Sequence, residues 1–124
     1  MKNALIIDKE RAIRKALTLF LIRKGYKTYS AETVSQAQKL MDNTSFDTII
    51  ADVSITDENA VRFYGEMNRL EEVNYIFTSA FPEEMPLSDS SRIKEAYFLE
   101  KPFSLNRLSE LLTPQYGEDL ALAV

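Results

Sequence analysis

Five side chains able to do chemistry follow four short, mostly apolar runs, at the points where those runs stop. They are Asp8, Lys9, Asp52, Ser79 and Lys101. Short continuous apolar runs are typical of buried strands in parallel sheets, whose ligand sites lie beyond the carboxyl ends of the strands. A carboxylate can act as a nucleophile or bind a cation, and an ammonium group neutralises negative charge. We therefore expect two carboxylates, a hydroxyl and two ammonium groups to converge on one edge of a sheet.

The elements that must position these groups alternate along the chain. The expected strands are Leu5–Ile7, Tyr26–Ser30, Thr48–Ala51, Tyr75–Thr78 and Tyr97–Leu99. Apolar residues at helical spacing predict helices around Ile13–Leu21 with Gly25 at its end, Glu32–Met41, Val61–Leu70 after the N-cap Asn59, and a last helix capped by Ser104 with Leu105, Leu108, Leu111 and Leu112 facing the core. This alternation predicts an α/β fold with a parallel sheet, helices on both faces and right-handed crossovers.

Length and composition exclude several classes of protein. A chain of 124 residues with 45% hydrophobic residues suits one domain with its own core. It has no cysteine and no histidine, which excludes disulfides, thiolate or imidazole metal sites and a Ser/His/Asp triad. Fifteen basic against nineteen acidic residues give a net charge of −4, so we expect no direct nucleic-acid binding. No apolar run reaches the ~20 residues that cross a membrane, the N-terminus does not resemble a signal peptide, and we expect a cytoplasmic protein.

Four short motifs together resemble the receiver domain of two-component response regulators. They are Ile6-Ile7-Asp8-Lys9-Glu10, Ile49-Ile50-Ala51-Asp52, Ser79-Ala80 and Lys101-Pro102-Phe103. Each is weak alone, but their order and spacing are specific. The resemblance covers residues 1–112 and implies a flavodoxin-like, doubly wound sheet of five parallel strands in the order 2-1-3-4-5. Residues 113–124 would then form a C-terminal tail or the start of a linker.

The resemblance also implies roles for the polar residues. Asp52 would accept a phosphoryl group from a sensor histidine kinase or a phosphotransfer protein, while Ser79 and Lys101 would bind the phosphoryl oxygens. Mg²⁺ would be held by Asp8, Asp52 and the backbone carbonyl of Ser54. The Lys101–Pro102 peptide bond is cis in many members of the family. The resemblance implies a signalling domain and not an enzyme.

One residue departs from the family at the expected metal site. Most receivers have two adjacent acids after the first strand, whereas here Asp8 is followed by Lys9. An ammonium group only donates hydrogen bonds and cannot replace a metal ligand. We therefore expect weak Mg²⁺ binding. Two interpretations of Lys9 remain: it swings out to solvent, or it reaches toward Asp52 and stands in for the metal, and we favour the second.

The resemblance also implies a switch that involves Ser79 and Phe98, the latter at the position that is often tyrosine. Strand alternation puts the neighbouring Tyr97 on the opposite face. We expect the partner or homodimer surface on the face formed by the fourth helix, the fifth strand and the fifth helix. The segment Pro82–Ser91 holds two prolines and three serines and should have low local stability.

Two alternatives have the same fold. A pseudo-receiver would be a protein-interaction module that is never phosphorylated in use. A flavodoxin-like enzyme would need a hydroxyl-rich phosphate loop after the first strand, where this chain has Asp8-Lys9-Glu10-Arg11. Three glycines in the whole chain make no glycine-rich phosphate loop. Because Asp52, Ser79 and Lys101 are all present, we favour the phosphorylated receiver.

Overall fold

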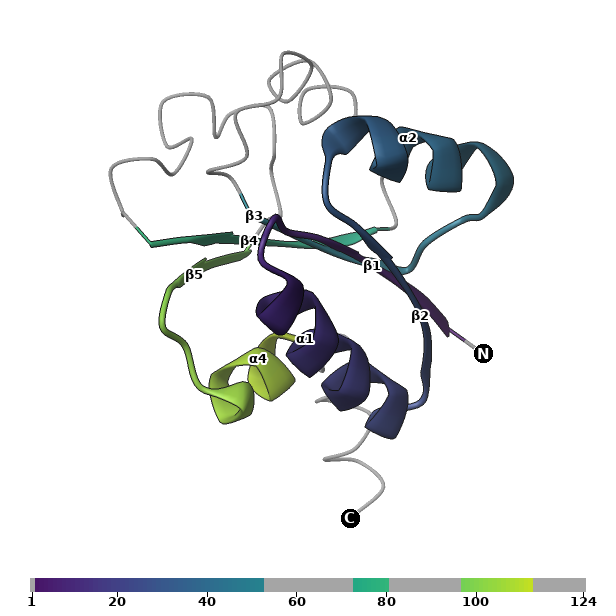
Figure 1. The fold of residues 1–124 in the computed structure, drawn as a ribbon. Helices are drawn as coiled ribbons and strands as arrows, with labels where there is room; N and C mark the ends of the chain where they lie inside the picture. Colours follow the sequence, from purple (N-terminus) through teal and green to yellow (C-terminus); the bar gives the residue numbers. More distant parts are fainter. Residues whose placement is uncertain (1, 53–72, 81–96, 113–124) are drawn as a thin grey trace.

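Five short segments rich in apolar and β-branched residues pair as one parallel sheet (Figure 1). The computed structural model describes residues 2–52, 73–80 and 97–112. The strands are β1 (Lys2–Ile7), β2 (Tyr26–Ala31), β3 (Thr48–Asp52), β4 (Asn74–Ser79) and β5 (Tyr97–Glu100). Their order across the sheet is β2-β1-β3-β4-β5, and every pair is parallel. The expected fold class and strand order are therefore confirmed.

Helices cover both faces of this sheet. Figure 1 shows α2 (Val34–Asn43) on one face, with α1 (Arg11–Arg23) and α4 (Leu105–Leu112) on the other. The helix expected at Val61–Leu70 with its cap Asn59, and the segment Pro82–Ser91, lie outside the described residues. In the part of the chain that is described, no helix is long and apolar enough to cross a membrane.

Two apolar clusters hold the layers together, one on each face of the sheet. The alternation of side chains along a strand divides β1 between them, because Leu5 and Ile7 point one way and Ala4 and Ile6 the other. The first cluster packs α2 on the sheet through buried residues that include Val34 and Ala37. The second packs α1 and α4 through the buried set Leu17, Leu21, Leu108, Leu111 and Leu112.

Polar groups close the ends of the helices. The Thr33 hydroxyl accepts a hydrogen bond from the Gln36 amide (3.1 Å), and the Ser104 hydroxyl accepts one from the Arg107 amide (3.1 Å), as expected for N-caps. Gly25 follows the end of α1 with φ +92°, a conformation that glycine adopts without strain. The buried Asn74 side chain donates to the Leu111 carbonyl (3.1 Å), which satisfies a group that the last turn of α4 leaves free.

Two details differ from the expectations. The second helix begins at Val34 and not at Glu32, because Thr33 has an extended backbone and acts as its N-cap. Leu105 was expected to face the core, but its side chain is exposed. It lies in the first turn of α4, at the flank of the stripe formed by Leu108, Leu111 and Leu112.

Tyr75 is buried on the face of the sheet that α2 covers, and this burial leads to a prediction about pH. Burial raises the pKa of its phenol to about 12, from an ordinary value near 10. The fold therefore favours the neutral phenol. Its contribution to stability should be complete below pH ~10 and should be lost as the pH rises through about 12. Urea unfolding between pH 9 and 12 should show a steeper loss of stability for the wild type than for Tyr75→Phe; parallel curves would contradict this.

Candidate functional site

The register of the sheet brings three strand ends to its carboxyl edge, with Asp8 level with Asp52 and Lys101 two residues further along. Ile7 of β1 is paired with Ala51 of β3, so the next residues, Asp8 and Asp52, stand side by side at the carboxyl edge. Asp52 and Asp8 also point to the same face, because they follow the alternation of Ile50 and Ile6 on the α1 side. Lys101 continues the alternation of Leu99 on β5 and joins them from the far side of β4.

The Lys101 ammonium connects the two carboxylates. Its Nζ donates to Asp8 Oδ2 at 2.8 Å and to Asp52 Oδ2 at 3.0 Å. All three groups are largely removed from water, with side-chain exposures of 14% for Lys101, 3% for Asp8 and 7% for Asp52. Burial by itself would lower the pKa of the Lys101 ammonium, but the hydrogen bonds and charges of the two carboxylates outweigh burial and raise it. Lys101 therefore stays charged at neutral pH.

Ser79 lies at the end of β4, between the strands that carry Asp52 and Lys101. It has no exposed surface, and its carbonyl accepts a hydrogen bond from the Lys101 amide at 2.7 Å. Asp52 is in register with Thr78, so Ser79 stands one residue beyond the carboxylate. The Lys101–Pro102 peptide bond is cis, as expected from the motif that follows β5.

The expectation that Lys9 reaches toward Asp52 is wrong in this structure. Lys9 is exposed, and among the described residues it makes no ion pair with Asp8 or Asp52. Alternation gives the physical reason, since consecutive residues leaving a strand point to opposite sides and Asp8 takes the buried side. The cation between the carboxylates comes instead from Lys101.

The carboxylates offer a divalent cation a small donor set. Asp8 and Asp52 supply hard oxygen ligands, but both Oδ2 atoms already accept hydrogen bonds from Lys101. Two carboxylates and one ammonium give a formal charge of −1. Within the described ranges, no three acidic side chains lie close enough to hold a metal. Ser54, whose carbonyl was the third expected ligand, lies outside these ranges.

Two features of the site were not anticipated from the sequence. One is that Lys101 pairs with Asp8 as well as with Asp52. The other is Arg14, whose guanidinium Nη1 donates to the carbonyls of Asp8 and Lys9. Arg14 lies in α1, and its contacts depend on the path of the loop after β1, which the sequence does not specify. The expected switch residue Phe98 is in register with Phe77, and its side chain lies outside the described part.

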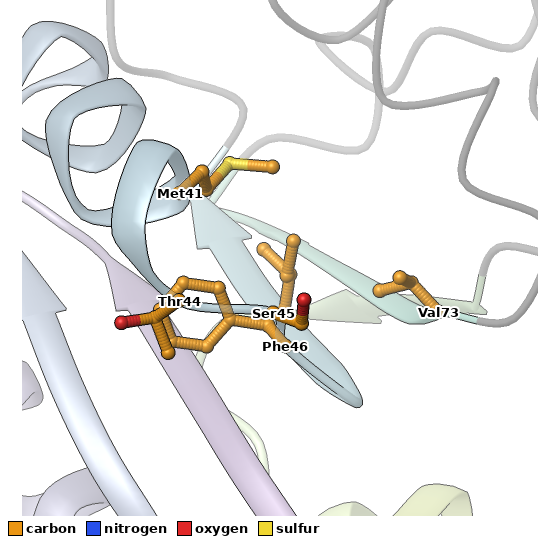
Figure 2. Close-up of a pocket in the computed structure, with 6 residues that line it drawn as sticks. Met41, Thr44, Ser45, Phe46 and Val73 are labelled. Carbon is orange, nitrogen blue, oxygen red and sulfur yellow. The ribbon is translucent and has the colours of Figure 1, made fainter.

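A small cavity near the opposite end of β3 has a different character (Figure 2). It has a volume of about 130 Å³ and is lined by Met41, Thr44, Ser45, Phe46, Ile49 and Val73. Its described lining has hydroxyl groups but no charged side chain. The chemistry therefore gathers at the carboxyl edge of the sheet.

Comparisons with known proteins agree with this geometry. A family model described as the response regulator receiver domain matches residues 4–113. The KDP operon transcriptional regulatory protein KdpE of Escherichia coli is 29% identical over 112 residues, which cover 90% of this chain and 50% of KdpE. The chain spans about half the length of the curated relatives it matches.

Solved structures share the fold. A two-component response regulator from Clostridium difficile superposes with a TM-score of 0.80 at 18% identity, over 91% of this chain and 93% of that one. The response regulator TrrA from Thermotoga maritima, solved in complex with Mg²⁺ and BeF, has a TM-score of 0.70 at 23% identity, over 90% of this chain and 99% of TrrA.

The sharing of the Lys101 ammonium by Asp8 and Asp52 should contribute to the stability of the fold. Lys101→Met keeps the length of the side chain but leaves two buried carboxylates without their cation. The free energy of unfolding should fall by about 3 kcal/mol in urea denaturation at neutral pH. Adding Asp8→Asn to Lys101→Met should recover part of the loss, because one uncompensated charge is removed. The matched control is Lys9→Met, which removes an exposed ammonium and should cost less than about 0.5 kcal/mol. Equal losses for the two lysine variants would contradict the charge arrangement.

Proposed function

This chain belongs to the family of response regulator receiver domains, and from that premise we propose that Asp52 is its phosphoacceptor. The receiver domain is the phosphorylatable module of two-component signal transduction. The observation that carries the assignment is the Lys101 ammonium within hydrogen-bond distance of both Asp8 and Asp52. A carboxylate next to a fixed cation at the end of a parallel strand has what a phosphoacceptor needs, a nucleophilic oxygen with positive charge beside it.

Phosphorylation requires little of the protein beyond position and charge. An Asp52 oxygen forms a bond to the phosphorus of the donor. The bond from phosphorus to the donor's leaving group breaks, and the leaving group keeps the electron pair. Negative charge on the equatorial phosphoryl oxygens must be stabilised meanwhile, and the Lys101 ammonium is close enough to Asp52 to do this. The motif implies that the hydroxyl of Ser79, whose carbonyl accepts the Lys101 amide, would bind a phosphoryl oxygen.

Mg²⁺ would bind through Asp8 and Asp52, where it would add positive charge next to the phosphoryl oxygens. We propose that this binding is weak. The site lacks the second acid at position 9, and its two carboxylates already share the Lys101 ammonium. The missing ligand and the reduced negative charge both lower the affinity for a divalent cation.

The domain would receive its phosphoryl group from a sensor histidine kinase or a phosphotransfer protein. We propose that residues 4–113 act as a signalling domain whose phosphorylation alters a protein-interaction surface, and not as an enzyme with a separate substrate. The surface that we propose for a partner or a second copy includes β5 and the last helix, α4. KdpE is a transcriptional regulatory protein of which this chain matches half, so an output function of that kind is one candidate for the protein as a whole.

The first test is phosphorylation itself. Incubation with acetyl phosphate should add one phosphate to the wild type in intact mass spectra, and Asp52→Asn should abolish the addition, because the nucleophilic oxygen is replaced. Asp42→Asn, an exposed position on α2, is the control and should leave phosphorylation unchanged. A wild type that stays unmodified with every donor and does not bind beryllofluoride would favour the interaction-module alternative.

The second test restores the missing acid. Lys9→Asp should tighten Mg²⁺ binding at least about tenfold, because it adds a hard oxygen ligand and removes a positive charge. The measurement is a Mg²⁺ titration followed by the amide NMR shifts of residues 8 and 52. Lys9→Gln separates the two effects, since it removes the charge without adding a carboxylate. Wild-type affinity equal to that of Lys9→Asp would show that position 9 does not limit metal binding.

A further inference from the structure

Arg14 of α1 bonds to the backbone that carries Asp8. Its Nη1 donates to the Asp8 carbonyl at 2.8 Å and to the Lys9 carbonyl at 2.9 Å. The Arg14 side chain is only 15% exposed, and its Nη2 lies 3.9 Å from Glu32 Oε1, a carboxylate that is 60% exposed. A long ion pair to an exposed carboxylate contributes little. The two carbonyl bonds are therefore the main polar contacts of this guanidinium among the described residues.

The loop from Asp8 to Glu10 has few other fixed points on its backbone. Glu10 is the N-cap of α1, and its side chain makes no capping hydrogen bond. The Asp8 amide donates to the Ala31 carbonyl (3.1 Å) and ends the ladder between β1 and β2. The Glu10 carbonyl accepts a hydrogen bond from the Arg14 amide (3.0 Å) in the first turn of α1. The carbonyls of Asp8 and Lys9 are joined to the helix by the Arg14 guanidinium, and a charged donor makes stronger hydrogen bonds than a neutral one.

The Asp8 carboxylate depends on this loop at both of its oxygens. Its Oδ1 accepts a hydrogen bond from the Glu10 amide at 2.9 Å, and its Oδ2 accepts one from Lys101 at 2.8 Å. If the backbone of residues 8–10 changed its conformation, the Asp8 carboxylate would lose both hydrogen bonds, the one from the Glu10 amide and the one from Lys101. Lys101 would then lose one of the two carboxylates that position it beside Asp52.

We propose that Arg14 is a positioning residue for the phosphorylation of Asp52. By holding two consecutive carbonyls, it fixes the turn that points the Asp8 carboxylate at Lys101 and leaves the Lys9 side chain in solvent. Position 9 of this loop carries a lysine where most receivers have a second adjacent acid, so the guanidinium fixes a turn to which Mg²⁺ would bind only weakly. The effect on phosphorylation rests on the proposed function. The two hydrogen bonds from Arg14 to the carbonyls of Asp8 and Lys9, called the clamp below, do not depend on it.

The experiment compares Arg14→Gln and Arg14→Lys with the wild type. Arg14→Gln should slow phosphorylation by acetyl phosphate by about 10- to 100-fold, the range expected when a group beside the reacting atoms is displaced. It should also speed hydrogen exchange of the Glu10 amide by about tenfold, because the Asp8 acceptor is no longer fixed. Arg14→Lys keeps a cationic donor that can reach one carbonyl, and its rate should lie between the other two.

Two controls separate the clamp from other effects of charge. Glu32→Gln removes the long ion pair but leaves the carbonyl bonds, and Arg23→Gln removes an exposed arginine from the far end of α1. Both should phosphorylate at the wild-type rate. If Arg14 acts through Asp8, Arg14→Gln should have little further effect in an Asp8→Asn background.

The outcomes distinguish this proposal from the proposed function. A wild-type phosphorylation rate in Arg14→Gln, or full additivity with Asp8→Asn, overturns the positioning role. If Arg14→Gln does not fold, Arg14→Lys decides, and a wild-type rate together with wild-type Glu10 exchange overturns it. If the wild type takes up no phosphate, the proposed function fails, and unchanged exchange at Glu10 in the Arg14 variants would overturn the clamp as well.

Discussion

The site depends on one buried ammonium group shared by two carboxylates. Isolated charges in a protein interior cost several kcal/mol each, so Asp8, Asp52 and Lys101 must stay in contact once the sheet has closed around them. They come from the ends of three different strands, β1, β3 and β5, and the parallel pairing brings these ends to one edge of the sheet. The parallel register therefore brings the three charged groups together, and the attraction between Lys101 and the two carboxylates in turn favours that register.

This sharing has a consequence for signalling. Asp8, Asp52 and Lys101 carry a formal charge of −1, and any phosphoryl group on Asp52 adds negative charge where a single ammonium already serves two acids. Lys101 would have to divide its hydrogen bonds among Asp8 and the new oxygens. Such a redistribution at the ends of β3 and β5 is a local electrostatic event that can bias neighbouring elements.

The supporting contacts work mainly through the backbone. Arg14 holds the carbonyls of residues 8 and 9, the Asn74 side chain holds the Leu111 carbonyl, and the Lys101 amide bonds to the Ser79 carbonyl. The two apolar clusters keep the helices on the sheet, while these polar bonds determine where particular loops lie. Rigid elements thus carry the charged groups, and hydrogen bonds to the loops orient them.

The five strands, their polar ends and the meeting of Asp8, Asp52 and Lys101 at one edge could be predicted from the sequence, because apolar runs and the motifs at their ends are local signals. Strand alternation also predicts that the side chains of residues 8 and 9 point to opposite sides, which agrees with the exposed position of Lys9. Which lysine neutralises the acids depends on the folded chain, since Lys101 and Asp8 are 93 residues apart in the sequence. The folded chain also decided the contacts of Arg14 and the exposure of Leu105. Such pairings depend on the path of loops and the level of strand ends, which only the packed chain specifies.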